Sequence, residues 1–158
     1  MNACPEVMKN FPALLTVAET NGMVERMSKE FEESALGLWA VELLSTSEFI
    51  GMVGLHIPNF EAHFTPCVEV GWRLRADTWG KGYAPEAAKV AMNDGFDRLL
   101  LPEIVAMTSV HNVPSMRVME KLGMLRSTGD DFDHPKIPAG DRLSRHVLYR
   151  LPAGGRNW

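Results

Sequence analysis

A strand, a glycine-rich turn and a long helix follow one another in the middle of the chain. Residues 68–74 alternate between apolar and polar or small side chains, which predicts a strand with Glu69, Gly71 and Arg73 on one face. Residues 84–99 repeat small and apolar residues at helical spacing, which predicts a helix with one buried stripe. The stripe consists of Ala84, Ala87, Ala88, Ala91, Met92, Gly95, Phe96 and Leu99.

The N-terminal region predicts a second long helix. Residues 5–12 allow one short helical turn, and Thr16 and Glu19 have the spacing of a capping box that opens a helix to about residue 33. The predicted inner face of this helix consists of Val17, Thr20, Val24, Met27 and Phe31. Gly37 interrupts the helical pattern.

The remaining pattern alternates between strands and one short helix. In chain order we expect an antiparallel hairpin of strands at 38–44 and 48–57, a loop at 58–66, a strand at 103–109, a helix at 113–122, a strand at 124–128, an irregular loop at 130–141 and a strand at 145–151. This order predicts an α/β (α+β) fold, with helices packed around one mostly antiparallel sheet.

Composition and charge exclude several classes of protein. The 158 residues are 46% hydrophobic, which predicts one domain over residues 1–158 with a loose tail at 152–158. A net charge of -4 gives no general nucleic-acid-binding surface. Two cysteines, Cys4 and Cys67, predict no disulfide framework and favour a reducing cytoplasm. No apolar run reaches the length of a signal segment or a membrane span, so no membrane partner is expected.

Gly80 and Gly82 lie where the predicted strand turns into the helix. Without side chains there, the backbone N–H groups of the helix N-terminus are bare, and the helix dipole favours an anion, best a phosphate. Lys81 adds a positive charge beside them, although a solvated loop lysine is the alternative. For the two glycines, the structural alternative is a tight turn that packs the helix closely on the strand.

The stretch from Trp79 to Ala84 resembles the coenzyme A pyrophosphate loop of the GNAT N-acetyltransferases, whose pattern is Gln/Arg-x-x-Gly-x-Gly/Ala. Gly82 and Ala84 match the last two positions, whereas Trp79 departs from the first. The phrase Trp-Gly-Lys-Gly-Tyr-Ala-Pro-Glu-Ala is similar to the branch of ribosomal-protein N-terminal (alanine/serine) acetyltransferases. A second stretch resembles the family's second motif; it reads Asn112-x-x-Ser115-x-Arg117-Val-x-Glu120-Lys121-x-Gly123-Met124.

The resemblance implies a GNAT-like fold. In it, the strands at 68–74 and 103–109 run parallel and splay apart, and the pantetheine arm of the cofactor threads the opening. The family's first strand and part of its first helix have no counterpart in this sequence, so an edge strand is expected to be uncovered. Because an uncovered edge recruits another chain, a homodimer is expected.

The resemblance also implies acetyl-CoA as cosubstrate. The implied cofactor-binding residues are Trp72, Arg73, Leu74, Trp79, Gly80, Lys81, Gly82, Tyr83, Ala84, Asn112, Ser115 and Arg117. Many family members carry a proton-donating tyrosine seven positions after the asparagine, where this chain has Met119. The branch resemblance implies Ser115 as the proton donor instead. Capping of a helix by Asn112, and solvation of Arg117 and Lys121, are the structural alternatives.

Glu69 is the candidate general base, because a thioester is attacked by a neutral amine and a carboxylate can take its proton. A solvent-facing glutamate is the alternative. Asp133 and His134 are candidates for the acceptor pocket, and the other histidines considered as bases are His56, His63 and His146. His63 and Cys67 alone do not make a metal site, so no metal is predicted.

The sequence therefore predicts an acetyl-CoA-dependent N-acetyltransferase that acts by direct transfer to a primary amine. The amine belongs to a protein N-terminus or to a small molecule. The first alternative is a non-catalytic acyl-CoA-binding or regulatory module, which Met119 favours. The second is a nucleotide-binding switch, but the chain lacks the Gly-x-x-x-x-Gly-Lys-Ser/Thr pattern.

Overall fold

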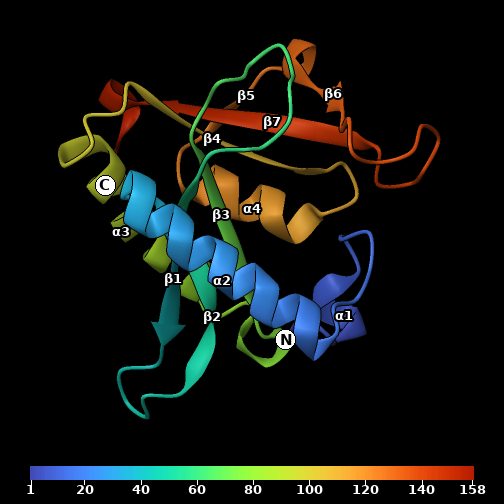
Figure 1. The fold of residues 1–158 in the computed structure, drawn as a ribbon. Helices are drawn as coiled ribbons and strands as arrows, with labels where there is room; N and C mark the ends of the chain where they lie inside the picture. Colours follow the sequence, from blue (N-terminus) through green and yellow to red (C-terminus); the bar gives the residue numbers. More distant parts are fainter.

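The computed structural model describes all 158 residues, and its centre is a seven-stranded mixed sheet (Figure 1). The strand order is β1-β2-β3-β4-β7-β5, and β6 also pairs with β7. Only β3 and β4 are parallel; the other pairs are antiparallel. The strands are β1 (Gly37–Glu42), β2 (Phe49–His56), β3 (Glu69–Leu74), β4 (Glu103–Ser109), β5 (Leu125–Arg126), β6 (Phe132–Asp133) and β7 (Arg145–Pro152). This confirms the predicted α/β fold.

The helices are α1 (Pro5–Met8), α2 (Val17–Ser34), α3 (Tyr83–Asp97) and α4 (Val113–Lys121). Single 3-10 turns occur at Ala76–Thr78, Thr128–Asp130 and Ala153–Gly155. In Figure 1, α2 crosses the sheet in front, while α3 lies behind it. No helix combines the length and apolar character that crossing a membrane requires.

The main core lies between the sheet and α3. Ala88, Ala91 and Met92 of α3 are fully buried there, and α4 adds Met119 and the following Leu122. A smaller cluster contains Phe64, Val105, Phe132 and Leu148. Ile104 and Ala106, which flank Val105 on β4, belong to the main core, so the two clusters lie on opposite faces of the sheet.

The helix α2 begins as its sequence predicts but presents a different face. The Thr16 hydroxyl accepts a hydrogen bond from the Glu19 N–H, and the Glu19 carboxylate accepts one from the Thr16 N–H, which completes the capping box. Thr20 and Met27 are half-buried as predicted, together with Gly22, Met23 and Glu30. The predicted inner residues Val17, Val24 and Phe31 are 79%, 50% and 46% exposed, so that part of the prediction was wrong.

The C-terminal tail lies against α3, although its glycines and polar residues predict a loose segment. Arg156 donates a hydrogen bond to Asp97 at 2.8 Å, and the Trp158 indole donates one to Asn93 at 3.2 Å. Lys89 lies over the Trp158 ring. These contacts attach residues 156–158 to the outer side of α3.

Candidate active site

The glycine turn presents a row of unused backbone donors. Gly80 and Gly82 have φ angles of 75° and 90°, in the left-handed region that favours glycine. The backbone N–H groups of residues 80–84 donate no hydrogen bond within the chain. A side chain at Gly80 or Gly82 would meet no protein atom within 4 Å, so the space above the turn is open. Because α3 starts here, its dipole adds positive potential.

These features fit the pyrophosphate of coenzyme A. Lys81 is exposed beside the row of donors, and Tyr83 and Ala84 are half-buried at the start of α3. Trp79 has a structural partner, because its indole N–H donates to the Leu74 carbonyl at 3.0 Å and so attaches the turn to the end of β3. Several N–H groups converging at a helix N-terminus are a site for a phosphate group.

The strands β3 and β4 separate close to their start. Their register holds one residue pair, Glu69 with Val105, and the Val105 N–H donates to the Val68 carbonyl at 2.9 Å. Beyond this point β3 pairs only with β2. That antiparallel pairing runs along all of β3, from Glu69 opposite His56 to Leu74 opposite Gly51. The side of β3 that faces β4 is therefore left without a strand partner from residue 70 to residue 74. An extended ligand arm fits such an opening.

The helix α4 starts beside this opening. Its N-cap, Asn112, accepts a hydrogen bond from the Ser115 N–H at 3.4 Å and donates to Thr108 at 2.8 Å. The Ser115 hydroxyl accepts a hydrogen bond from the Trp72 indole at 3.3 Å, which leaves the hydroxyl proton available for donation. The structure thus brings two predicted residues, Trp72 and Ser115, into contact across the opening.

Alternate side chains of β3 serve different faces. Val70 and Leu74 are buried in the main core, and Trp72 packs against it. Arg73 points to the other face, where it donates to Asn2 at 2.9 Å and its guanidinium lies 4.0 Å from the centre of the Phe11 ring. Burial lowers the pKa of Arg73 to about 10. The side chain of Arg73 is held by the N-terminal segment, and its backbone N–H points to β2, so the structure does not bring this predicted cofactor-binding residue to the opening.

Glu69 is paired with a histidine on the same face as Arg73. Its Oε2 lies 3.1 Å from the Nε2 of His56, and the two side chains are 13% and 30% exposed. Burial disfavours the charged imidazole, but the hydrogen bond and charge of Glu69 and the charge of Glu30 raise the pKa of His56. Sequence reasoning missed this pair, because the facing positions depend on the register of β2 and β3 across a long loop.

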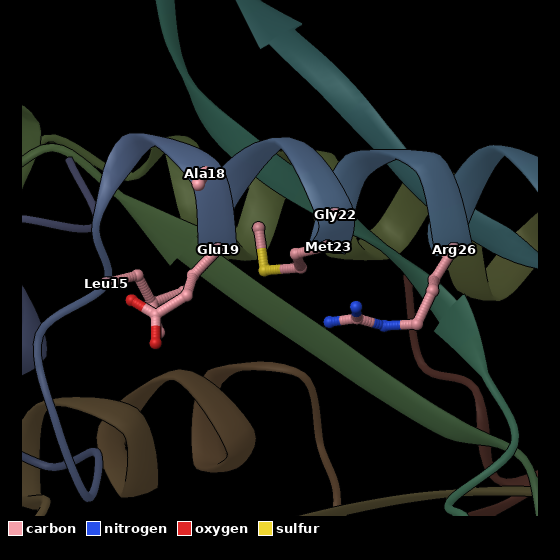
Figure 2. A pocket seen from close by; sticks show the side chains of 6 residues that line it. All are labelled: Leu15, Ala18, Glu19, Gly22, Met23 and Arg26. Atoms are coloured by element: carbon pink, nitrogen blue, oxygen red, sulfur yellow. The ribbon is translucent and has the colours of Figure 1, made fainter.

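A hollow of about 560 Å³ lies along the side of α2 that faces β3 (Figure 2). It is lined by Leu15, Ala18, Glu19, Gly22, Met23 and Arg26. Figure 2 shows that Glu19, Met23 and Arg26 all project from α2 into the same space. A second hollow of about 230 Å³ continues along α2 to Glu30 and Ile57. This side of the sheet is open and carries charges of both signs.

His134 and His146 lie together beside the smaller core cluster. The rings of His134 and His146 lie 4.9 Å apart, and the Phe60 ring lies 4.6 Å from His134. Burial lowers the pKa of both histidines. The negative charge of Glu69 acts in the opposite direction and favours a higher pKa for His134.

The structure contains no group of three or more His, Cys, Asp or Glu side chains that could hold a metal ion. His63 lies 3.4 Å from Asp130. Burial raises the pKa of Cys67 to about 11, so its thiol is protonated at neutral pH. Both cysteines are free thiols.

The second motif divides between the core and the surface. Met119, at the position where family members carry tyrosine, is fully buried in the main core, so it takes no part in the surface of the opening. Arg117 and Lys121 are exposed, and neither side chain makes a hydrogen bond or an ion pair. Both are accessible to a phosphate in solution.

Comparison with known proteins gives relatives that are similar in sequence. An uncharacterized N-acetyltransferase, YnaD, of Bacillus subtilis is 40% identical over 96 residues, which are 61% of this chain and 55% of that protein. The uncharacterized protein YkkB of the same organism is 30% identical over 120 residues, which are 76% of this chain and 69% of YkkB. This chain therefore spans only about half the length of YnaD.

Solved structures of known acetyltransferases have a similar fold. A GNAT-family acetyltransferase from Bacillus anthracis superposes with a TM-score of 0.76 at 28% identity, over 97% of this chain and 85% of the other. A ribosomal-protein-S5-alanine acetyltransferase from Vibrio fischeri shares the fold with a TM-score of 0.69 at 18% identity, over 93% and 78% of the two chains. The family described as "Acetyltransferase (GNAT) domain" matches residues 1–125. The chain therefore belongs to the GNAT acetyltransferase family, as its glycine turn predicts.

Proposed function

We propose that this chain transfers the acetyl group of acetyl-CoA directly to a primary amine. The observation that carries the proposal is the row of unbonded N–H groups at residues 80–84, at the start of α3 and after the end of β3 that has separated from β4. Acetyl-CoA supplies the acetyl thioester. The residues that would hold it are those of the turn, with Lys81, Asn112 and Arg117 at its margins.

In the proposed reaction the amine nitrogen bonds to the thioester carbon and the carbon–sulfur bond breaks. Glu69 takes the proton that the amine loses, directly or through a water molecule. Ser115 gives its hydroxyl proton to the departing sulfur and regains a proton from solvent, while Glu69 releases its proton to solvent; the place of Ser115 in the first turn of α4 favours negative charge there. The backbone N–H of Trp72, on the side of β3 that has no strand partner, is placed to donate to the carbonyl oxygen. No covalent enzyme intermediate is needed.

The acceptor is proposed only as a class. Solved neighbours of similar fold are named for ribosomal-protein alanine or serine acetylation and, in Vibrio cholerae, for spermidine N-acetylation. Both kinds of acceptor present a primary amine. The solved neighbours themselves are less than 25% identical to this chain in sequence. The open hollows along α2 suit an acceptor that enters from the α2 side, where Glu69 lies.

We also propose a homodimer in a reducing cytoplasm. The strand β1 is the edge of the sheet, with β2 on one side only, so its outer edge offers backbone groups to a second copy. The two free thiols are consistent with a reducing compartment. Light scattering on the purified protein tests the dimer: a monomer at micromolar concentration contradicts it.

The main experiment is a titration by calorimetry with acetyl-CoA, coenzyme A and ATP, together with CoA release on adding acceptors. The acceptors are short peptides that begin with Ala or Ser, and spermidine. We expect micromolar binding of both CoA forms, no binding of ATP, and acetylation of one acceptor. We expect E69Q and S115A each to lower kcat by about 100-fold with little change in acetyl-CoA binding. Tight CoA binding without acetylation of any amine indicates the non-catalytic module.

A further inference from the structure

Glu69 and His56 face each other across two strands. The register of β2 and β3 pairs the two residues directly, so their side chains leave the sheet on the same face. The His56 Nε2 is 3.1 Å from the Glu69 Oε2. The other ring nitrogen, Nδ1, is buried and makes no hydrogen bond, so Glu69 is the only hydrogen-bond partner of the His56 side chain.

The residues around the His56 imidazole leave space for the ring but restrict its movement. A Cβ at Gly71 would lie 3.3 Å from the His56 Cε1, so the absence of a side chain at Gly71 provides the space that the imidazole occupies. The residue after His56 is also held, because the Ile57 N–H donates to the Glu30 carboxylate of α2 at 3.3 Å. Residues of β3 therefore hold the His56 ring, and Glu30 of α2 holds the backbone next to it.

We propose that His56 is the positioning residue for the general base: its Nε2–H holds one oxygen of Glu69 and leaves the other oxygen to take the proton of the acceptor amine. This inference rests on the proposed role of Glu69. A carboxylate accepts several hydrogen bonds, so occupation of Oε2 does not block Oε1. Fixing the carboxylate matters because a small misplacement of a catalytic group costs a large factor in rate.

Several charged and titratable groups surround this pair. Glu30 lies on α2 above His56, and Arg26, Lys29 and Glu33 line the same small hollow as Glu30. Cys67, just before β3, and His134, just after β6, also lie near Glu69, and the negative charge of Glu69 acts to raise the pKa of each. Glu69 and Glu30 together keep His56 protonated to higher pH than an isolated histidine.

The test is a set of variants assayed for CoA release with Ala- and Ser-initiated peptides and with spermidine. H56L removes the donor and is expected to lower kcat by about 10- to 100-fold without changing the Kd for acetyl-CoA. H56Q restores a donor and is expected to recover most of kcat. In the E69Q background, H56L is expected to have no further effect, because His56 acts through Glu69. H63Q, which removes a histidine from another carboxylate pair, is the control and is expected to keep kcat.

Two outcomes overturn the proposal: H56L with unchanged kcat, or H56L with the same loss whether or not Glu69 is present. If E69Q keeps full activity, the proposed role of Glu69 fails, which is a different result. An NMR titration of the His56 ring gives a readout that needs no acceptor. We expect its pKa to fall in E69Q; an unchanged titration shows that the two side chains are not coupled and contradicts the proposal.

Discussion

The helices α2 and α3 have similar lengths, 18 and 15 residues, and both are amphipathic by pattern, yet they are built into the molecule differently. Five residues of α3 are buried, and Ala88, Ala91 and Met92 have no exposed surface. None of the residues of α2 is buried. The helix α2 rests on the sheet through half-buried side chains such as Met23 and Met27, and two hollows remain along it.

The difference matches the parts that the two helices would take in the proposed reaction. The phosphate turn works only if the N-terminus of α3 is fixed, because backbone donors must converge on one point. A closely packed helix provides that. On the α2 side, a loosely packed helix leaves open space that would admit the proposed amine acceptor. In the proposed transfer, tight packing would serve acetyl-CoA and open packing would serve the amine.

The largest effect should come from the core side of α3. M92A removes a fully buried side chain and is expected to lower the free energy of unfolding by about 2–5 kcal/mol. M27A makes the same change on α2, where the side chain is half-exposed, and is expected to cost less than about 1 kcal/mol. Urea denaturation followed by circular dichroism measures both. Equal losses would show that α2 is packed as firmly as α3, against the comparison.

The next effect concerns the phosphate turn. G82A is expected to weaken acetyl-CoA binding by about 10- to 100-fold, because a methyl group occupies the open space over the backbone donors. Gly140 provides the matched control: its φ is 82° and its Cβ would also meet no protein atom, but it lies in a distant loop. Both variants carry a backbone strain of about 1–2 kcal/mol. Calorimetry should show weaker binding only for G82A, and a similar loss in G140A would attribute the effect to stability.

A smaller effect concerns the capping box of α2. T16A removes the hydroxyl that accepts from the Glu19 N–H, and we expect a loss of about 1 kcal/mol in the free energy of unfolding. T16S keeps the hydroxyl and should retain nearly all of the stability. Because α2 buries no side chain completely, the cap is a large part of what holds it. If T16A is as stable as the original chain, packing rather than capping fixes the helix start.

The smallest effect is a pair of opposite pH dependences. The pKa of His56 is raised, so its contribution to stability is present below about pH 6.5 and is lost as the pH rises through its folded pKa. The pKa of His146 is lowered by burial, so stability is lost as the pH falls through about 6.5. The stability advantage of the original chain over H56Q should shrink as the pH rises above about 6.5. Its advantage over H146Q should shrink as the pH falls below about 6.5. Thermal melts across this range measure both, and two shifts of the same sign would contradict the assignment.

The sequence alone identified the fold because its strongest patterns are local. The strand at β3, the stripe of α3 and the glycines between them lie within one continuous stretch, so spacing along the chain fixes their geometry. The α4 start was equally local, since Asn112 and Pro114 mark a helix N-terminus by their own chemistry. Only the glycine turn and the α4 start of the candidate site could be predicted in this way.

Tertiary structure decided what pairs residues across the sheet and how α2 is turned. The pairing of His56 with Glu69 depends on the register of β2 and β3, which are joined by the 12-residue loop at 57–68. No local pattern encodes that register. The helix α2 has enough apolar residues to define a face, but the sheet offers it little surface, so Val17, Val24 and Phe31 stay exposed. The contact between Trp72 and Ser115 likewise joins residues 43 apart in sequence. Local periodicity determines which elements form, whereas packing between distant elements determines which side chains meet.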